Sequence, residues 1–264
     1  MAIAPPRSLS PTKVSAFTNC PLAFRLTNID RIPEPPTPHL VKGTLVHSAL
    51  ERLFWQYPAG SRSPSAGQAS LEGAWAALQT DPEFVALALS DDDAAAFLDD
   101  ARLLMRNYFT LEDPDRVREV GIELGLQAEL GGAHLRGIID RLDLTEQGEL
   151  VVIDYKTGKS PSARFEQARL TGVHLYALLC QQVLGRLPVA VRLLHLRDAV
   201  TITAVPTEQT SRGQRIRTTA IWSAIERACA NEDFRPKPGP LCRFCNFQSM
   251  CPAFGGAPPA LMAS

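Results

Sequence analysis

Charged side chains lie within two otherwise apolar, strand-like segments of this sequence. In residues 150–158, which read LVVIDYKTG, the charged residues are Asp154 and Lys156. Side chains two positions apart in a strand point to the same face, so the carboxylate and the ammonium group would share one site. The pattern therefore predicts a site that holds both charges.

A second carboxylate, Asp140, lies in an apolar strand pattern over residues 134–142. The alternation places Asp140 on the same face as Ile138 and Leu142, where an acid without a partner is costly. A Gln-Gly-Glu turn follows, so the two segments are expected to pair as a hairpin. The hairpin would bring Asp140 beside Asp154.

Two carboxylates and a lysine on adjacent strands form a candidate site for Mg²⁺, a hard ion that prefers oxygen ligands. Asp140 and Asp154 would bind the ion, and Lys156 would stabilise charge on a water or phosphate oxygen. This is the chemistry of metal-assisted phosphodiester hydrolysis. The alternative is a hairpin with a surface ion pair, which typically contributes only about 0–1 kcal/mol to stability.

The text GIIDRLDL, followed after the turn by VVIDYKTGK, resembles the PD-(D/E)XK nuclease superfamily and specifically its RecB-like branch. The resemblance implies an α/β protein with a restriction-endonuclease-like core, in which helices flank a mixed central β-sheet. It also implies a Mg²⁺- or Mn²⁺-dependent deoxyribonuclease. The family suggests exonuclease action on single-stranded DNA or DNA ends, in repair, recombination or end processing.

The cysteines form a second candidate metal site. Cys242, Cys245 and Cys251 are clustered as C-x2-C-x5-C, whereas Cys20 lies alone near the N-terminus. This layout fits an iron–sulfur cluster better than the paired knuckles of a zinc ribbon. AddB-type helicase-nuclease subunits and a CRISPR-associated exonuclease of the RecB-like branch carry a [4Fe–4S] cluster with one cysteine before the nuclease core and three after it. The resemblance therefore implies these four cysteines as cluster ligands.

Zinc bound by the same four thiolates is an alternative, and disulfides are another. Cys180 and Cys229 lie in helical patterns and are predicted to be small buried hydrophobes. The first seven residues lack the apolar core of a signal peptide, and no stretch approaches the roughly 20 apolar residues of a membrane span. We therefore expect a cytoplasmic protein without a membrane partner.

A helix predicted over residues 41–57 carries His47 and Glu51 on one face. Its G-x-x-x-H text resembles the RecB-like segment whose histidine contributes to the metal site, which implies His47 as a ligand. Imidazole suits Mn²⁺ better than Mg²⁺, and a structural histidine is the alternative. Glu51 would be a further helix charge. Glu123, where family members often carry an acid, is either an additional site carboxylate or an edge-strand charge.

A helix predicted over residues 164–184 would form the crossover between two parallel strands. Part of it resembles the family's Q-x-x-x-Y segment. Tyr176 matches the tyrosine, which the family places by the active site, although it could equally be a core aromatic. Gly172 stands where the family has glutamine, and Gln167 or His174 are the candidates to replace it.

We predict a single nuclease domain over residues 1–264. Within it, residues 61–113 would form a helical insertion that begins with a flexible Ser- and Gly-containing linker. Residues 236–254 form the cysteine segment. The cluster would attach this segment to a first helix, which is expected to begin at Ser10-Pro11 and to carry Cys20 near its end. Further elements are expected as follows: strands from about residue 117, over 189–196 and over 200–205, and a helix over 208–230.

A net charge of −1 does not by itself indicate nucleic-acid binding. The best local candidate for a DNA path is Arg212, Arg215 and Arg217, which could also be an ordinary solvated helix face. No Walker-type phosphate-binding motif occurs, so any unwinding would come from a helicase partner. Two alternative functions follow: a non-catalytic DNA-binding accessory module of a helicase-nuclease complex, favoured by the missing glutamine, and a zinc-stabilised interaction protein.

Overall fold

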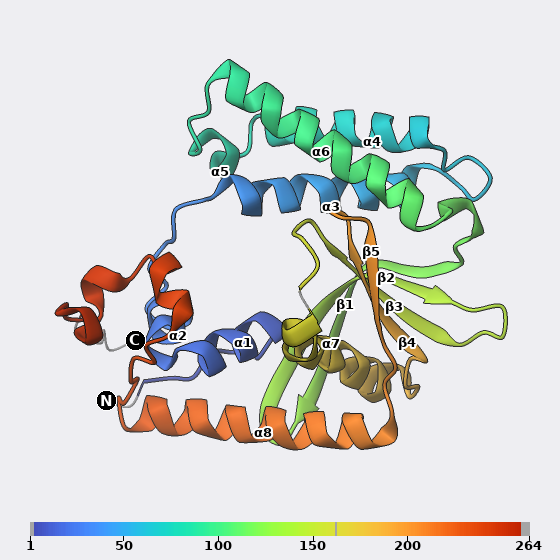
Figure 1. Ribbon diagram of the computed structural model, residues 1–264. Helices are drawn as coiled ribbons and strands as arrows, with labels where there is room; N and C mark the ends of the chain where they lie inside the picture. The colour runs from blue at the N-terminus through green and yellow to red at the C-terminus, as the bar shows by residue number, and fades with distance from the viewer. Residues whose placement is uncertain (1–2, 162, 260–264) are drawn as a thin grey trace.

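A computed structural model describes residues 3–161 and 163–259, with the backbone only for residues 163–171. In this part of the chain five strands form one mixed sheet in the order of the sequence (Figure 1). Strands β3 and β4 are parallel and the other neighbours are antiparallel. The strands are β1 (Glu119–Leu130), β2 (Ala133–Leu144), β3 (Leu150–Lys156), β4 (Ala190–His195) and β5 (Val200–Ala204).

One face of the sheet is covered by helices that include the crossover between β3 and β4. A parallel pair needs such a crossover, since a tight turn cannot join its ends. The helices on this face are α1 (Pro11–Asn19), α7 (Ala163–Leu184) and α8 (Glu208–Ala230). Their apolar side chains form a continuous core with β2, β3 and β4, in which Val152, Leu178 and Leu193 are buried.

Further helices cover the opposite face and form a second core with β3 and β4. They are α3 (Pro38–Gln56), α4 (Pro64–Leu78), α5 (Pro82–Val85) and α6 (Asp91–Leu111). The mixed sheet with helices on both faces is consistent with the restriction-endonuclease-like core that the sequence predicts.

The prediction of a flexible linker at the start of residues 61–113 is wrong. Helix α4 already begins at Pro64, and the Ser63 hydroxyl accepts a hydrogen bond from the Ala66 N–H at its N-terminus. Arg62 is buried and forms an ion pair with Glu119 at the start of β1. This segment is therefore held by a helix cap and by a buried charge pair.

The alternation of side chains in β1 and β2 is interrupted at Glu123 and Asp140. Ile122 pairs with Arg141, and both side chains lie on the α3 side of the sheet. Two residues further, Leu124 pairs with Ile139, and both contact the α7 side. Side chains two positions apart in a regular strand point to the same face. Here they point to opposite faces, so the alternation is broken between these two pairs, at Glu123 and Asp140.

In β1 this exchange of faces coincides with an unusual backbone conformation at Glu123. Its φ angle is +46°, in the left-handed region that residues other than glycine seldom adopt. The prediction that Asp140 shares a face with both Ile138 and Leu142 is therefore wrong for Leu142. Ile138 is 45% exposed, whereas Leu142 lies in the core beside α7.

The two ends of the described chain meet beside α2 (Pro21–Asn28), as the sequence predicts (Figure 1). Leu22 and Leu26 of α2 form a small apolar cluster with Phe247. The C-terminal segment consists of short 3-10 turns, namely η2 (Pro240–Phe244), η3 (Gln248–Met250) and η4 (Pro252–Phe254), and one more turn, η1 (Pro114–Arg116), precedes β1.

Candidate active site

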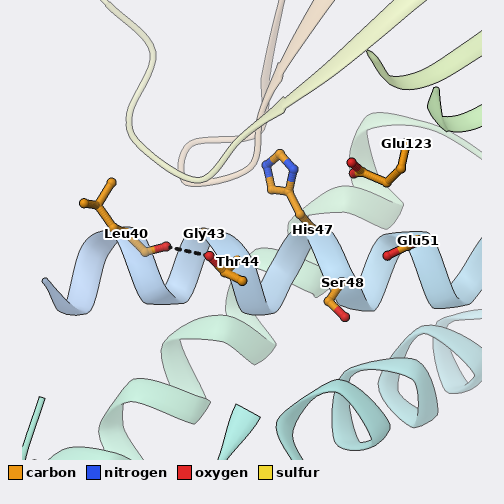
Figure 2. Close-up of a pocket in the computed structure, with 7 residues that line it drawn as sticks. All are labelled: Leu40, Gly43, Thr44, His47, Ser48, Glu51 and Glu123. Atoms are coloured by element: carbon orange, nitrogen blue, oxygen red, sulfur yellow. Dashed lines mark hydrogen bonds between the residues drawn. The ribbon is translucent and has the colours of Figure 1, made fainter. Parts of the chain in front are cut away.

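Three potential metal ligands converge between α3 and the sheet. Among the described residues, one atom each of His47, Glu123 and Asp140 lies within 4.8 Å of the other two. They come from the middle of α3, from the irregular point of β1 and from the opposing residue of β2. His47 and Glu123 extend from these separate elements into the same space (Figure 2). Glu123, a secondary candidate in the sequence, thus belongs to the group.

The backbone of Tyr155 orients two of these side chains. Its N–H donates to Asp140 Oδ2 at 2.7 Å, and its carbonyl oxygen lies 3.1 Å from His47 Nε2. Because a carbonyl oxygen can only accept, Nε2 of His47 carries the proton. Nδ1, which lies 3.6 Å from Asp140 Oδ1, is then the nitrogen with a free lone pair in neutral histidine. Metal-binding histidines commonly donate their other N–H in this way.

Asp154 and Lys156 flank Tyr155 in β3 and form an ion pair, with 2.5 Å between Asp154 Oδ2 and Lys156 Nζ. Asp154 is 6% exposed, while the Lys156 side chain reaches solvent. Asp154 does not belong to the 4.8 Å group, but its charge acts on Asp140. The structure therefore brings all three predicted residues of the hairpin into one region.

The carboxylates of this region are held where negative charge is unfavourable. Burial, and then the charge of Asp154, raises the pKa of Asp140 to about 6, against the opposing effects of His47 and of the Tyr155 N–H. Burial, and then the charge of Asp140, raises the pKa of Glu123 to about 7. A cation bound among these oxygens would offset both effects, which is a common arrangement at functional sites.

Tyr176 of α7 lies close to the same acids. Burial raises the pKa of its phenol far above the usual range, and the charges of Asp154, Asp140 and Glu123 add to this shift. The phenol therefore stays protonated and can donate a hydrogen bond. Gly137 allows the approach, since a Cβ atom there would lie 2.7 Å from a Leu179 methyl and 3.3 Å from the Tyr176 ring.

One turn before Tyr176, the position of the missing glutamine is open. A Cβ atom on Gly172 would meet no atom of the described part of the chain within 4 Å. The side chain of Gln167 lies outside the described residues. His174 is partly buried, and burial lowers its pKa.

An open pocket of about 430 Å³ runs along α3 beside this group (Figure 2). It is lined by Leu40, Gly43, Thr44, His47, Ser48, Glu51 and Glu123. All but the last come from one face of α3, at spacings of three and four residues that place side chains above one another. The pocket gives His47 and Glu123 access to solvent.

The arginines proposed as a DNA path lie elsewhere. Arg212, Arg215 and Arg217 are exposed on α8, which covers the side of the sheet opposite to α3 (Figure 1). The structure does not bring them to the pocket.

The four cysteines of the second candidate site are neighbours. Burial, and then the charges of Cys20, Cys242 and Cys251, raises the pKa of Cys245. Cys20, Cys245 and Cys251 also pack against the apolar cluster beside α2. All six cysteines lie in the described chain, and each is a free thiol in the structure.

The spacing of these sulfurs differs from that of a zinc site. Within the described chain, no three of the cysteine sulfurs lie within 4.8 Å of one another. A tetrahedral zinc site with Zn–S bonds of about 2.3 Å would bring them to roughly 3.8 Å. Cys180 and Cys229 are buried in the core beside α7, as predicted.

A family model of the PD-(D/E)XK nuclease superfamily matches residues 8–252. The chain belongs to this superfamily. The match includes both strands of the hairpin and all four clustered cysteines, and it agrees with the expectation drawn from the GIID and DYK motifs.

Two phage proteins resemble this PD-(D/E)XK protein over nearly their full lengths. The Gene 69 protein of Mycobacterium phage D29 is 26% identical over 286 residues, which covers 95% of this chain and 97% of the phage protein. The Gene 69 protein of Mycobacterium phage L5 is 25% identical over 298 residues, with coverage of 96% and 98%.

A solved structure supports the fold of this PD-(D/E)XK protein. It is that of a protein from Eubacterium rectale provisionally assigned as an exonuclease, with a TM-score of 0.58 and 12% sequence identity. The similarity covers 90% of this chain and 87% of that protein. No helix in the described ranges is long and apolar enough to cross a membrane.

Proposed function

We propose that this protein is a metal-dependent deoxyribonuclease that hydrolyses phosphodiester bonds at DNA ends, as an exonuclease. The observation that carries the proposal is the convergence of His47, Glu123 and Asp140 beside an open pocket that His47 and Glu123 line, with the Asp154–Lys156 pair next to them. Membership of a nuclease superfamily supports the proposal. The raised pKa values of Glu123 and Asp140 also support it, because such shifts are common at functional sites.

The donor set fits a divalent cation. Two carboxylates and a neutral imidazole match the ligands of Mn²⁺, and carboxylates and water match those of Mg²⁺. When bound, the ion would polarise the scissile phosphate and acidify a water molecule. Asp140, Glu123 and His47 would hold it, with Asp154 as a further oxygen ligand from β3.

Lys156 and Tyr176 would act on the substrate. The Lys156 ammonium is held by Asp154 and reaches solvent, so it can stabilise negative charge on the phosphate or orient the attacking water. The protonated phenol of Tyr176 can donate a hydrogen bond to the DNA strand. Both groups would contribute electrostatic stabilisation that is in place before the reaction starts.

We further propose that the cysteine segment holds a [4Fe–4S] cluster, as in AddB-type proteins and the CRISPR-associated exonuclease. Cys20, Cys242, Cys245 and Cys251 supply four thiols from two ends of the chain, and their spread exceeds that of a zinc tetrahedron. When bound, the cluster would supply iron–thiolate bonds that cross-link the two ends. We regard residues 1–264 as one domain, in which residues 61–113 form a helical insertion.

Cleavage of end-labelled single- and double-stranded DNA tests the nuclease proposal. Anaerobically purified protein is compared with Asp154→Ala and Lys156→Ala in the presence of Mg²⁺ or Mn²⁺. Asp99→Ala is the matched control, because Asp99 also forms an ion pair but lies exposed on α6. We expect metal-dependent cutting in the wild type and the control only. Equal cutting by Asp154→Ala would reject the assigned site.

The second candidate is a DNA-binding accessory module that works with a helicase. It is favoured by Gly172, which stands where the family has glutamine. Wild-type protein that binds DNA but does not cut it with either metal would support this function instead.

A further inference from the structure

A buried arginine directly follows Asp140 in β2. Arg141 is 0% exposed, and its guanidinium lies 4.7 Å from the centre of the Phe54 ring on α3. It forms bidentate ion pairs with Glu112, at 2.5 and 2.9 Å, and with Asp143, at 2.8 and 2.9 Å. Burial of a cation is costly unless its donors are satisfied, and here two carboxylates satisfy them.

The remaining contacts of Arg141 are with two buried tyrosines. Its Nη1 donates to the Tyr155 hydroxyl at 2.7 Å and to the Tyr108 hydroxyl at 3.3 Å. The rings of Tyr108 and Tyr155 meet edge to face with centroids 5.9 Å apart. Tyr108 belongs to α6, and Glu112 directly follows the last residue of this helix. Arg141 therefore joins α6 to the sheet.

Tyr155 connects this network with the candidate metal site. Its ring hydroxyl is held by Arg141, while its backbone N–H and carbonyl hold Asp140 and His47. The Tyr155 and His47 rings also meet edge to face, at 5.9 Å. One residue therefore lies between the buried arginine and two of the proposed ligands.

We propose that Arg141 is a positioning residue of the metal centre, which sets the places of Asp140 and His47 through Tyr155 and ties them to α6. The inference rests on the proposed function, since it assigns a role within that site. It gives the segment of residues 61–113 a part in activity through Glu112, which directly follows α6 and forms the bidentate pair with Arg141.

The chain contains a matched control for this arginine. Arg62 is 3% exposed, forms an ion pair with a glutamate, Glu119, and stacks over the same Phe54 ring at 4.6 Å. The other hydrogen bonds of its guanidinium in the described part of the chain go to the carbonyls of Tyr57 and Pro114. Arg62 therefore resembles Arg141 in burial and stacking but does not contact Tyr155.

Binding of Mn²⁺ alone, measured by electron paramagnetic resonance and calorimetry, tests the proposal. We compare wild type with Tyr155→Phe and Tyr108→Phe, and Arg141→Met with Arg62→Met. Loss of a group that orients metal ligands typically weakens metal affinity about 10–100-fold, and we expect this range for Tyr155→Phe and Arg141→Met. Tyr108→Phe and Arg62→Met should keep the wild-type affinity even where they lower the melting temperature.

Cleavage rates add a second readout. At saturating Mn²⁺ the Tyr155→Phe variant should recover most of the wild-type rate, because the ligands themselves are intact. Wild-type Mn²⁺ affinity in folded Tyr155→Phe would overturn the proposal. The two tyrosine variants decide the question even if Arg141→Met does not fold. Mn²⁺ binding without any DNA cleavage in the wild type would reject the nuclease function and leave the positioning role intact.

Discussion

The proposed ligands of the acidic centre lie on long elements of the fold, whereas the clustered cysteines lie at the ends of helices and on short turns. His47 sits in the middle of α3, and Asp140 is held by the backbone of the adjacent strand. In the cysteine segment, Phe247 is buried, but Leu241, Phe244 and Phe254 are exposed. Backbone hydrogen bonds to Asp140 and His47 hold the first region in place, while the second has little apolar burial to do so.

This difference implies different consequences of losing each site. A centre that the fold holds in place can lose a ligand and stay folded, so that only the chemistry is lost. A segment with little buried surface takes its stability from what it binds, because metal binding is then part of the folding free energy. Substitutions in the two regions should therefore separate activity from stability.

The largest effect is expected for Asp140→Asn. Loss of one preorganised charged group commonly costs about 10²–10³-fold in rate, and loss of a metal ligand should reach at least that range. The melting temperature should not fall, because the amide removes repulsion from Asp154. Cleavage kinetics and thermal unfolding of the same preparation check this. A large fall in stability would break the contrast between the regions.

Cys245→Ser should show the opposite pattern. Loss of a cross-link between distant segments typically costs about 2–5 kcal/mol, taking disulfides as the reference, which lowers the melting temperature on the order of 10 °C. Iron content should fall at the same time, and limited proteolysis should remove the C-terminal turns first. Ser249→Ala, an exposed change in the same segment, is the control. An unchanged melting temperature would contradict the comparison.

The acidic centre should also respond to pH in a defined direction. Glu123 and Asp140 have pKa values raised to about 7 and about 6, so protons compete with Mn²⁺ below these values and metal affinity should rise from pH 5 to pH 8. The folding stability of the metal-free protein should follow the opposite trend and fall as the pH rises. A raised carboxyl pKa means that the folded state binds more protons than the unfolded state, so this contribution to stability is lost as pH rises through 6 and 7.

Thermal melts between pH 5 and pH 8, with and without Mn²⁺, measure both trends. A variant with Glu123→Gln and Asp140→Asn together should show neither trend. A metal affinity that does not change over this range would contradict the burial of these carboxyl groups.

The smallest effect is expected for Gly172→Gln. Glycine within a helix costs about 0.5–1 kcal/mol relative to other residues, and the open space at this position accepts a side chain. Stability should rise by that amount, and the cleavage rate should rise if the amide supports the substrate. Gly172→Ala separates the two effects, since it restores helix propensity without an amide. Denaturant unfolding and initial rates provide the measurements.

The sequence by itself determined the chemistry of the hairpin. Charged residues are rare in apolar strand patterns, so Asp140, Asp154 and Lys156 stood out without any knowledge of the fold. Local periodicity also predicted the crossover helix and α8, because regular burial leaves a regular pattern in the chain. The same reasoning would have singled out Arg141, another charge within the apolar run.

Only the tertiary structure decided how these residues meet. In β1 the exchange of faces occurs at Glu123, and no local preference of glutamate predicts its left-handed backbone. The role of Tyr155 depends on its backbone atoms, and these are the same for every residue type except proline. His47 and Arg62 gained their partners from strands distant in sequence. Local patterns record which face of an element is buried, whereas contacts between distant elements arise only when the chain is packed.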